Sequence, residues 1–132
     1  MMFTANQLVA HAFGDYILQS QWMADNKTKR SIAALAHATT YMLPFLILTR
    51  SPLALLVMWG SHFLIDRFRL ARYVCWLKNG PLMRWHGGLV WKRMTATGYQ
   101  DAVPAWMAVW LLVIADNVCH VLINGAALRW LV

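Results

Sequence analysis

Histidine and aspartate recur at a spacing of four residues in this chain. Three of the five aspartates have a histidine four residues away along the sequence. These pairs are His11 with Asp15, His62 with Asp66, and Asp116 with His120. On an α-helix, side chains four residues apart lie on one face with their Cβ atoms about 5–6 Å apart, and imidazole and carboxylate groups are common ligands of divalent metal ions. The spacing therefore predicts that each pair can bind one ion together.

All three pairs fall in apolar stretches, and His37 supplies an imidazole in the remaining apolar stretch. The predicted metal ligands are His11, Asp15, His37, His62, Asp66, Asp116 and His120. Seven ionisable groups in apolar surroundings are costly unless they are neutralised. We therefore expect a divalent metal, zinc first and manganese or iron as alternatives, with enough ligands for two ions. The alternative is a purely structural network in which each histidine bonds its own aspartate.

The three paired aspartates, Asp15, Asp66 and Asp116, are also candidate catalytic residues. A two-metal centre can activate a water and clamp the oxygens of a phosphoester. Amide side chains that could orient ligands or substrate, or equally join helices by hydrogen bonds, are Gln19, Asn117 and Asn124. A basic patch beside Asp66 suits phosphate, but it also suits membrane topology and anionic lipid; it consists of Arg67, Arg69 and Arg72.

The composition indicates that lipid surrounds the elements that hold these residues. The chain is 60% hydrophobic and only 13% charged, whereas a soluble domain has about 25% charged residues. We predict an all-α fold, an integral membrane bundle of four transmembrane helices in a single domain, 1–132. The helices are expected at about 3–23, 31–49, 52–76 and 104–128. In the first, Gln7, His11, Asp15 and Gln19 form one polar stripe, which should face the other helices.

Basic residues are concentrated between the apolar stretches. Twelve Lys and Arg against five acids give a net charge of +7, and the clusters lie in loops, as the positive-inside rule describes. This pattern predicts a multi-pass bacterial inner-membrane protein with both termini on the non-cytoplasmic side. Residues 77–103 mix basic residues with tryptophan, which suits an interfacial segment between the third and fourth helices. Anionic membrane lipids are the expected partners; nucleic acid is not expected, and a homo-oligomer is left open.

Three runs of the sequence resemble the domain-of-unknown-function family 3307, a group of short phage and bacterial membrane proteins. The runs are HAFGDYILQSQWMADNK (11–27), HFLIDRFRLARY (62–73) and TGYQDAVPAWMAVWLLVIADNVCHVLIN (97–124). The resemblance covers nearly the whole chain and implies a bacterial or prophage inner-membrane protein, but it implies no activity.

A weaker resemblance is to membrane-bound metal-dependent hydrolases and to the helical zinc-dependent phospholipase C and P1 nuclease group. Only the pair spacing matches, and the chain has no glutamate for that group's pattern. With the site chemistry, the resemblance suggests a metal-dependent hydrolase acting on a phosphoester or phospholipid headgroup at the cytoplasmic side. The alternatives are a membrane accessory protein with a structural His/Asp network, and an ion- or proton-conducting protein.

Overall fold

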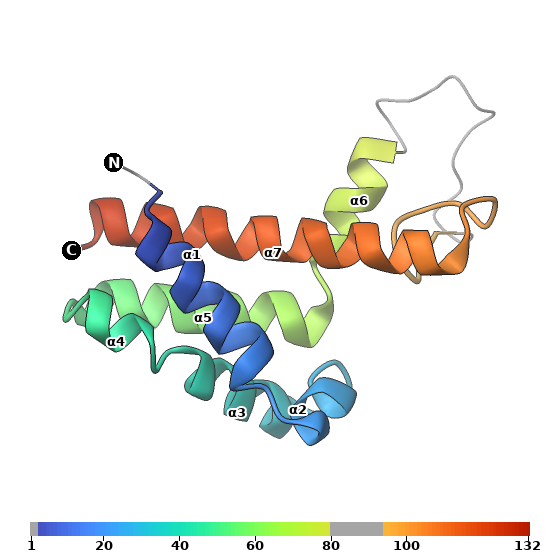
Figure 1. Cartoon of the computed structure of the whole chain (residues 1–132). Helices are drawn as coiled ribbons and strands as arrows, with labels where there is room; N and C mark the ends of the chain where they lie inside the picture. Colours follow the sequence, from blue (N-terminus) through green and yellow to red (C-terminus); the bar gives the residue numbers. More distant parts are fainter. Residues whose placement is uncertain (1–2, 80–93) are drawn as a thin grey trace. The chain divides into compact units, whose positions relative to one another are not determined.

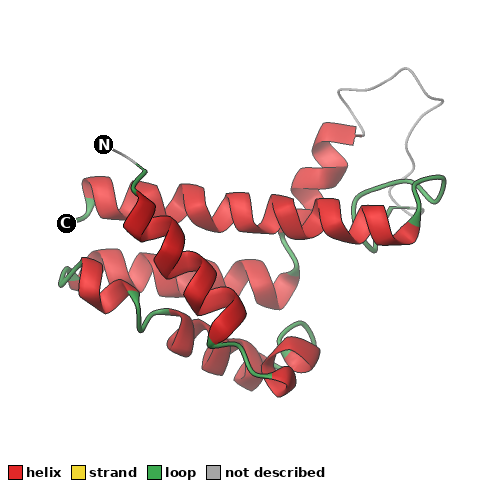
Figure 2. Ribbon diagram, viewed as in Figure 1, coloured by secondary structure: helices red, strands yellow, loops and turns green. Residues whose placement is uncertain are grey.

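The computed structural model describes residues 3–79 and 94–132, and every regular element in these ranges is a helix (Figure 2). In chain order (Figure 1), the elements are α1 (Ala5–Ala12), the π-helical turn η1 (Phe13–Ile17), α2 (Gln21–Asn26), α3 (Ser31–Tyr41), α4 (Phe45–Leu48), α5 (Pro52–Phe68), α6 (Ala71–Asn79) and α7 (Ala105–Trp130). The predicted all-α class is confirmed for these residues. Most of the predicted interfacial segment, residues 80–93, lies outside them.

The internal contacts of the chain divide it into two compact units. The first unit runs up to Arg69 and also contains His120–Val132, and the second is Leu70–Cys119. The long helix α7 therefore contributes its last part to the first unit. The residues that matter for the predicted site are nearly all in this first unit.

The predicted first helix, 3–23, is two helices in the structure. Its first part widens into η1, where Leu18 N–H donates to the carbonyl of Phe13 at 3.1 Å, five residues back. The chain then breaks, and the Ser20 hydroxyl accepts from Met23 N–H at 3.3 Å. A serine in this position caps a new helix start, so α2 is separate and Gln19 lies between the two helices.

The predicted second and third helices are also interrupted. In 31–49, Pro44 has no N–H to donate to the carbonyl of Thr40, and the chain forms a turn between α3 and α4. In 52–76, Arg69 adopts a left-handed conformation with φ 52°. That conformation ends a right-handed helix, so α5 stops at Phe68 and α6 begins at Ala71.

Two segments are long and apolar enough to cross a membrane: Ser31–Leu48, with 18 residues, and Ala105–Trp130, with 26 residues. The predicted fourth helix, 104–128, agrees with α7. Much of α7 exposes large apolar side chains, among them Trp106, Val109, Trp110, Ile114, Val118 and Leu122. The membrane association expected from composition therefore has two candidate spans in the described residues.

The core of the first unit brings α3, α4 and α5 together. Tyr41, Phe45 and Met58 are fully buried in it, and Ala54 and Ala127 also belong to it. Alanine leaves little side chain between neighbouring backbones, which allows helices to approach closely. Helix α3 packs along α5 and contacts η1, and this packing positions the polar residues described next.

Candidate metal centre

Four predicted ligands from three elements meet inside the first unit. Asp15 belongs to η1, His37 to α3, and His62 and Asp66 to α5. All four are buried, with 6%, 0%, 1% and 4% of their surface exposed, respectively. On α5 the spacing of four places His62 and Asp66 on one face, and that face is turned towards α3 and η1.

The converging atoms are one atom from each side chain. His37 Nε2 lies 3.0 Å from His62 Nε2, 3.1 Å from Asp15 Oδ1 and 3.2 Å from Asp66 Oδ2. His62 Nε2 lies 3.5 Å from Asp15 Oδ1 and 3.3 Å from Asp66 Oδ2. The cluster therefore consists of two imidazole nitrogens and two carboxylate oxygens that all lie within 4.8 Å of one another.

These distances match the dimensions of a tetrahedral metal site. Zinc binds nitrogen and carboxylate oxygen at about 2.0–2.2 Å, so the edges of its ligand tetrahedron measure about 3.3–3.6 Å. The five distances above run from 3.0 to 3.5 Å, so small outward movements of the side chains are sufficient. Asp15, His37, His62 and Asp66 can hold one divalent ion.

His11 and His120 lie beside the cluster rather than in it. His11 Nε2 is 3.7 Å from Asp15 Oδ2, and His120 Nε2 is 3.6 Å from Asp66 Oδ1. Each carboxylate thus has one oxygen in the cluster and its other oxygen beside a further histidine. Such outer contacts fix the orientation of ligating carboxylates.

Tyr41 connects this outer layer to the cluster. Its hydroxyl accepts a hydrogen bond from Asn124 Nδ2 at 2.6 Å and pairs with His11 Nδ1 at 2.8 Å. Its ring stacks on the imidazole of His62, with centroids 3.7 Å apart and planes 17° apart. Tyr41 is fully buried, so it restricts the positions of both histidines.

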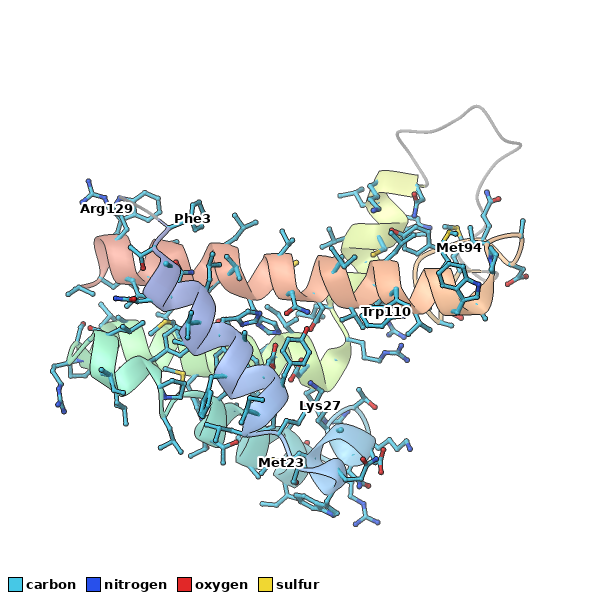
Figure 3. All side chains as sticks on the ribbon, viewed as in Figure 1. Phe3, Met23, Lys27, Met94, Trp110 and Arg129 are labelled. Carbon is cyan, nitrogen blue, oxygen red and sulfur yellow. The ribbon has the colours of Figure 1, made fainter. Side chains whose placement is uncertain are left out.

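Lys27 brings a positive charge into contact with the cluster. Its Nζ lies 2.9 Å from Asp66 Oδ2, the oxygen that faces His37 and His62. Lys27 follows α2 in the loop to α3 (Figure 3), and 19% of its side chain is exposed. One ammonium against two buried carboxylates leaves one negative charge, which a proton on an imidazole would balance; a divalent ion in place of the ammonium would balance both carboxylates.

Arg67 positions the loop that contains Lys27. Its Nη1 donates to the carbonyl of Thr28 at 2.8 Å, and its Nε donates to Ser31 Oγ at 3.1 Å. Arg67 is predicted from the sequence to bind substrate or to lie behind the ligands, in a basic patch beside Asp66. In the structure its guanidinium is engaged with the loop instead.

The remaining predicted site residues are not among these four ligands. Gln19 is half-buried beyond the end of η1, and Arg69 is exposed at the end of α5. Three more belong to the second unit: Arg72, Asp116 and Asn117. Arg72 donates to the carbonyl of Thr95 at 3.2 Å, and Asn117 Nδ2 donates to the carbonyl of Val113 in its own helix at 2.7 Å.

Sequence reasoning missed Lys27 and Tyr41. Lys27 lies in a basic loop and looked like a topology signal, because nothing local distinguishes it from its basic neighbours. A pattern in the sequence does indicate Tyr41, since His37, Tyr41 and Phe45 recur every four residues, and all three are buried.

The polar stripe predicted to face inward from the first helix is buried at three of its positions, Gln7, His11 and Asp15.

In the described residues, the fold and the cluster define an all-helical protein with a buried His/Asp cluster and two segments long and apolar enough to cross a membrane. The chain belongs to a family of proteins of unknown function, DUF3307, whose model matches residues 3–86. The matched region contains all four cluster residues and Lys27. No curated protein and no solved structure matches the chain.

Proposed function

We propose that the protein is a membrane-embedded divalent-metal-binding protein whose ion lies between Asp15, His37, His62 and Asp66. The observation that supports this proposal is the convergence of four ligand atoms from three separate elements at distances of 3.0 to 3.5 Å. Two imidazoles and two carboxylates suit zinc first, with manganese or iron as alternatives. A divalent ion also neutralises the two carboxylates that the cluster buries.

The activity we propose is hydrolysis of a phosphoester, with a phospholipid headgroup as the substrate that a membrane site would meet. An ion held by His37, His62 and Asp66 would keep its fourth position for a water and would lower the pKa of that water. Asp15, with His11 at its second oxygen, is the better placed base, because Asp66 also binds Lys27. Asp15 would accept the proton of the water as the new P–O bond formed and the ester P–O bond broke, and it would then give that proton to the leaving oxygen.

The location we propose is a bacterial inner membrane, with the centre nearer the cytoplasmic side. The loop 24–30, which contains Lys27, Lys29 and Arg30, would be cytoplasmic by the positive-inside rule. Four membrane crossings would place both termini on the non-cytoplasmic side. Two of these crossings would be Ser31–Leu48 and Ala105–Trp130. Anionic lipids would contact the basic loops.

The test is the metal content of the protein purified in detergent. We expect about one divalent ion per chain in the centre, and a loss of affinity of more than about 100-fold in His62→Ala and Asp66→Ala, because even outer-layer substitutions cost 10–100-fold. Asp25→Asn is the matched control, since Asp25 is an exposed aspartate bonded to Gln21. Protein that contains no stoichiometric ion and binds no added zinc, manganese or iron would contradict the proposal.

Hydrolysis is tested separately on the loaded protein. Asp15→Asn should retain an ion through the remaining three ligands but lose phosphodiesterase turnover in lipid vesicles. If the metal-loaded wild type cleaves no phosphoester, the proposed hydrolase activity is wrong, whereas the proposed metal binding is unaffected.

A structural network is the second candidate function, and the Lys27–Asp66 ion pair favours it. That ammonium and one protonated imidazole would neutralise both carboxylates without a metal. In this case the protein is an accessory protein. The loss of stability that His62→Ala causes relative to the wild type is then the same with and without added zinc.

A further inference from the structure

One oxygen of the cluster has two possible cationic partners. Asp66 Oδ2 faces His37 Nε2 and His62 Nε2 at 3.2 and 3.3 Å, as a metal ligand would. The same oxygen bonds Lys27 Nζ at 2.9 Å. The other oxygen of Asp66, Oδ1, faces His120. The ammonium therefore contacts the oxygen that would bind the metal, and not the second oxygen of the carboxylate.

A divalent ion on Asp66 Oδ2 would lie close to that ammonium. With a metal–oxygen bond of about 2 Å and the observed N–O distance of 2.9 Å, the two cations would be separated by no more than the sum of these lengths. Like charges at such a distance repel strongly in a buried site. Binding of the ion and the Lys27–Asp66 bond therefore oppose one another.

Lys27 also has a way out of the cluster. Its side chain is 19% exposed, whereas that of Asp66 is 3% exposed and that of His37 is fully buried. The loop after Lys27 is held by Arg67 through Thr28 and Ser31. The ammonium can thus leave for solvent or lipid headgroups by side-chain rotation, while the backbone stays in place.

We propose that the Lys27 ammonium and a divalent ion compete for Asp66 Oδ2, so that Lys27 sets the metal affinity of the centre and is released when the ion binds. This inference rests on the proposed metal-binding function. It assigns to Lys27 the role of a built-in counter-ion that keeps Asp66 charged and oriented, and it makes the centre favour ions that bind strongly enough to displace an ammonium.

The first test compares zinc and cobalt(II) affinity in four full-length proteins in detergent: wild type, Lys27→Met, Lys27→Arg and Lys29→Met. Lys27→Met should bind either ion at least about tenfold more tightly, since a nearby positive charge is removed. Lys27→Arg and Lys29→Met should stay within about threefold of wild type; Lys29 is exposed and is the matched control. Unchanged or weaker binding by a folded Lys27→Met protein would overturn the inference.

The second test needs no variant. Lysine amines in the wild type are labelled with an acetylating reagent, with and without saturating zinc, and quantified by peptide mass spectrometry. Zinc should increase labelling of Lys27 severalfold and leave that of Lys29 unchanged. If zinc binds and Lys27 labelling does not change, the competition is wrong but the metal centre stands; if no zinc binds, the proposed function itself fails.

Discussion

At the scale of the residue, the candidate centre is defined as much by the side chains around the ligands as by the ligands. The hydroxyl of Tyr41 joins His11 to Asn124, and its ring stacks on His62. Buried polar groups without partners are expensive. Tyr41 thus satisfies two buried side chains while its ring supports a ligand.

Tyr41→Phe separates these two roles. The ring stacking on His62 is kept, but the buried groups of His11 and Asn124 lose their common partner, so we expect a loss of about 1–3 kcal/mol in unfolding free energy. Metal affinity should fall by less than about tenfold if the ring alone supports His62. Thermal unfolding and zinc titration measure the two effects, and Tyr73→Phe, at an exposed tyrosine, is the control. A variant as stable as wild type would show that the hydroxyl contacts contribute nothing.

At the scale of the element, the π-helical turn η1 places Asp15 against α3. Gly14 precedes Asp15 and is buried where η1 meets Tyr41. A Cβ at Gly14 would lie 2.7 Å from Tyr41 Cδ2 and 2.9 Å from the Tyr41 carbonyl oxygen. The second of these atoms is backbone and cannot move aside easily, so the close approach requires glycine.

Gly14→Ala should therefore displace η1 from α3. We expect a destabilisation of about 1–3 kcal/mol from overpacking, together with weaker zinc binding because Asp15 Oδ1 moves away from His37. The control is Gly60→Ala in α5, where no atom lies within 4 Å of the added Cβ. That substitution should be neutral or stabilising by up to about 1 kcal/mol. Equal stability and equal zinc affinity in both variants would contradict this account of η1.

At the scale of the whole molecule, the two apolar segments Ser31–Leu48 and Ala105–Trp130 indicate association with a membrane. Only the first contains a cluster ligand, His37, and it is also the segment that Pro44 interrupts. Helix α7 is continuous and exposes apolar side chains along much of its length. It is therefore the better segment for a test of insertion.

Lysine at both Ile114 and Val118 tests whether α7 spans the membrane. These side chains are 55% and 50% exposed, and a lysine near the centre of a spanning helix costs about 2.5–3.5 kcal/mol. We expect the double variant to lose most of the membrane fraction that resists alkaline extraction. Val132→Lys, at an exposed residue after the end of α7, should remain in it. Full retention of the double variant would exclude α7 as a span.

The sequence by itself determined the helical class, the apolar segments and the candidate residues. These depend on composition and on periodicities that one helix displays alone, such as the spacing of His62 and Asp66. It did not determine where helices end, because the breaks at Ser20, Pro44 and Arg69 depend on local capping and backbone conformation that the long apolar runs obscure.

Only the tertiary structure decided which of the seven candidates share one site. His62 and Asp66 share one face of α5 and both belong to the cluster, yet the cluster takes Asp15 without His11 as a direct member, adds His37, and does not include Asp116, which belongs to the second unit. The contact of Lys27 with Asp66 was invisible in the sequence, since it joins residues 39 apart. Such contacts arise from the packing of η1, α3 and α5, and helical periodicity contains no information about which helices pack together.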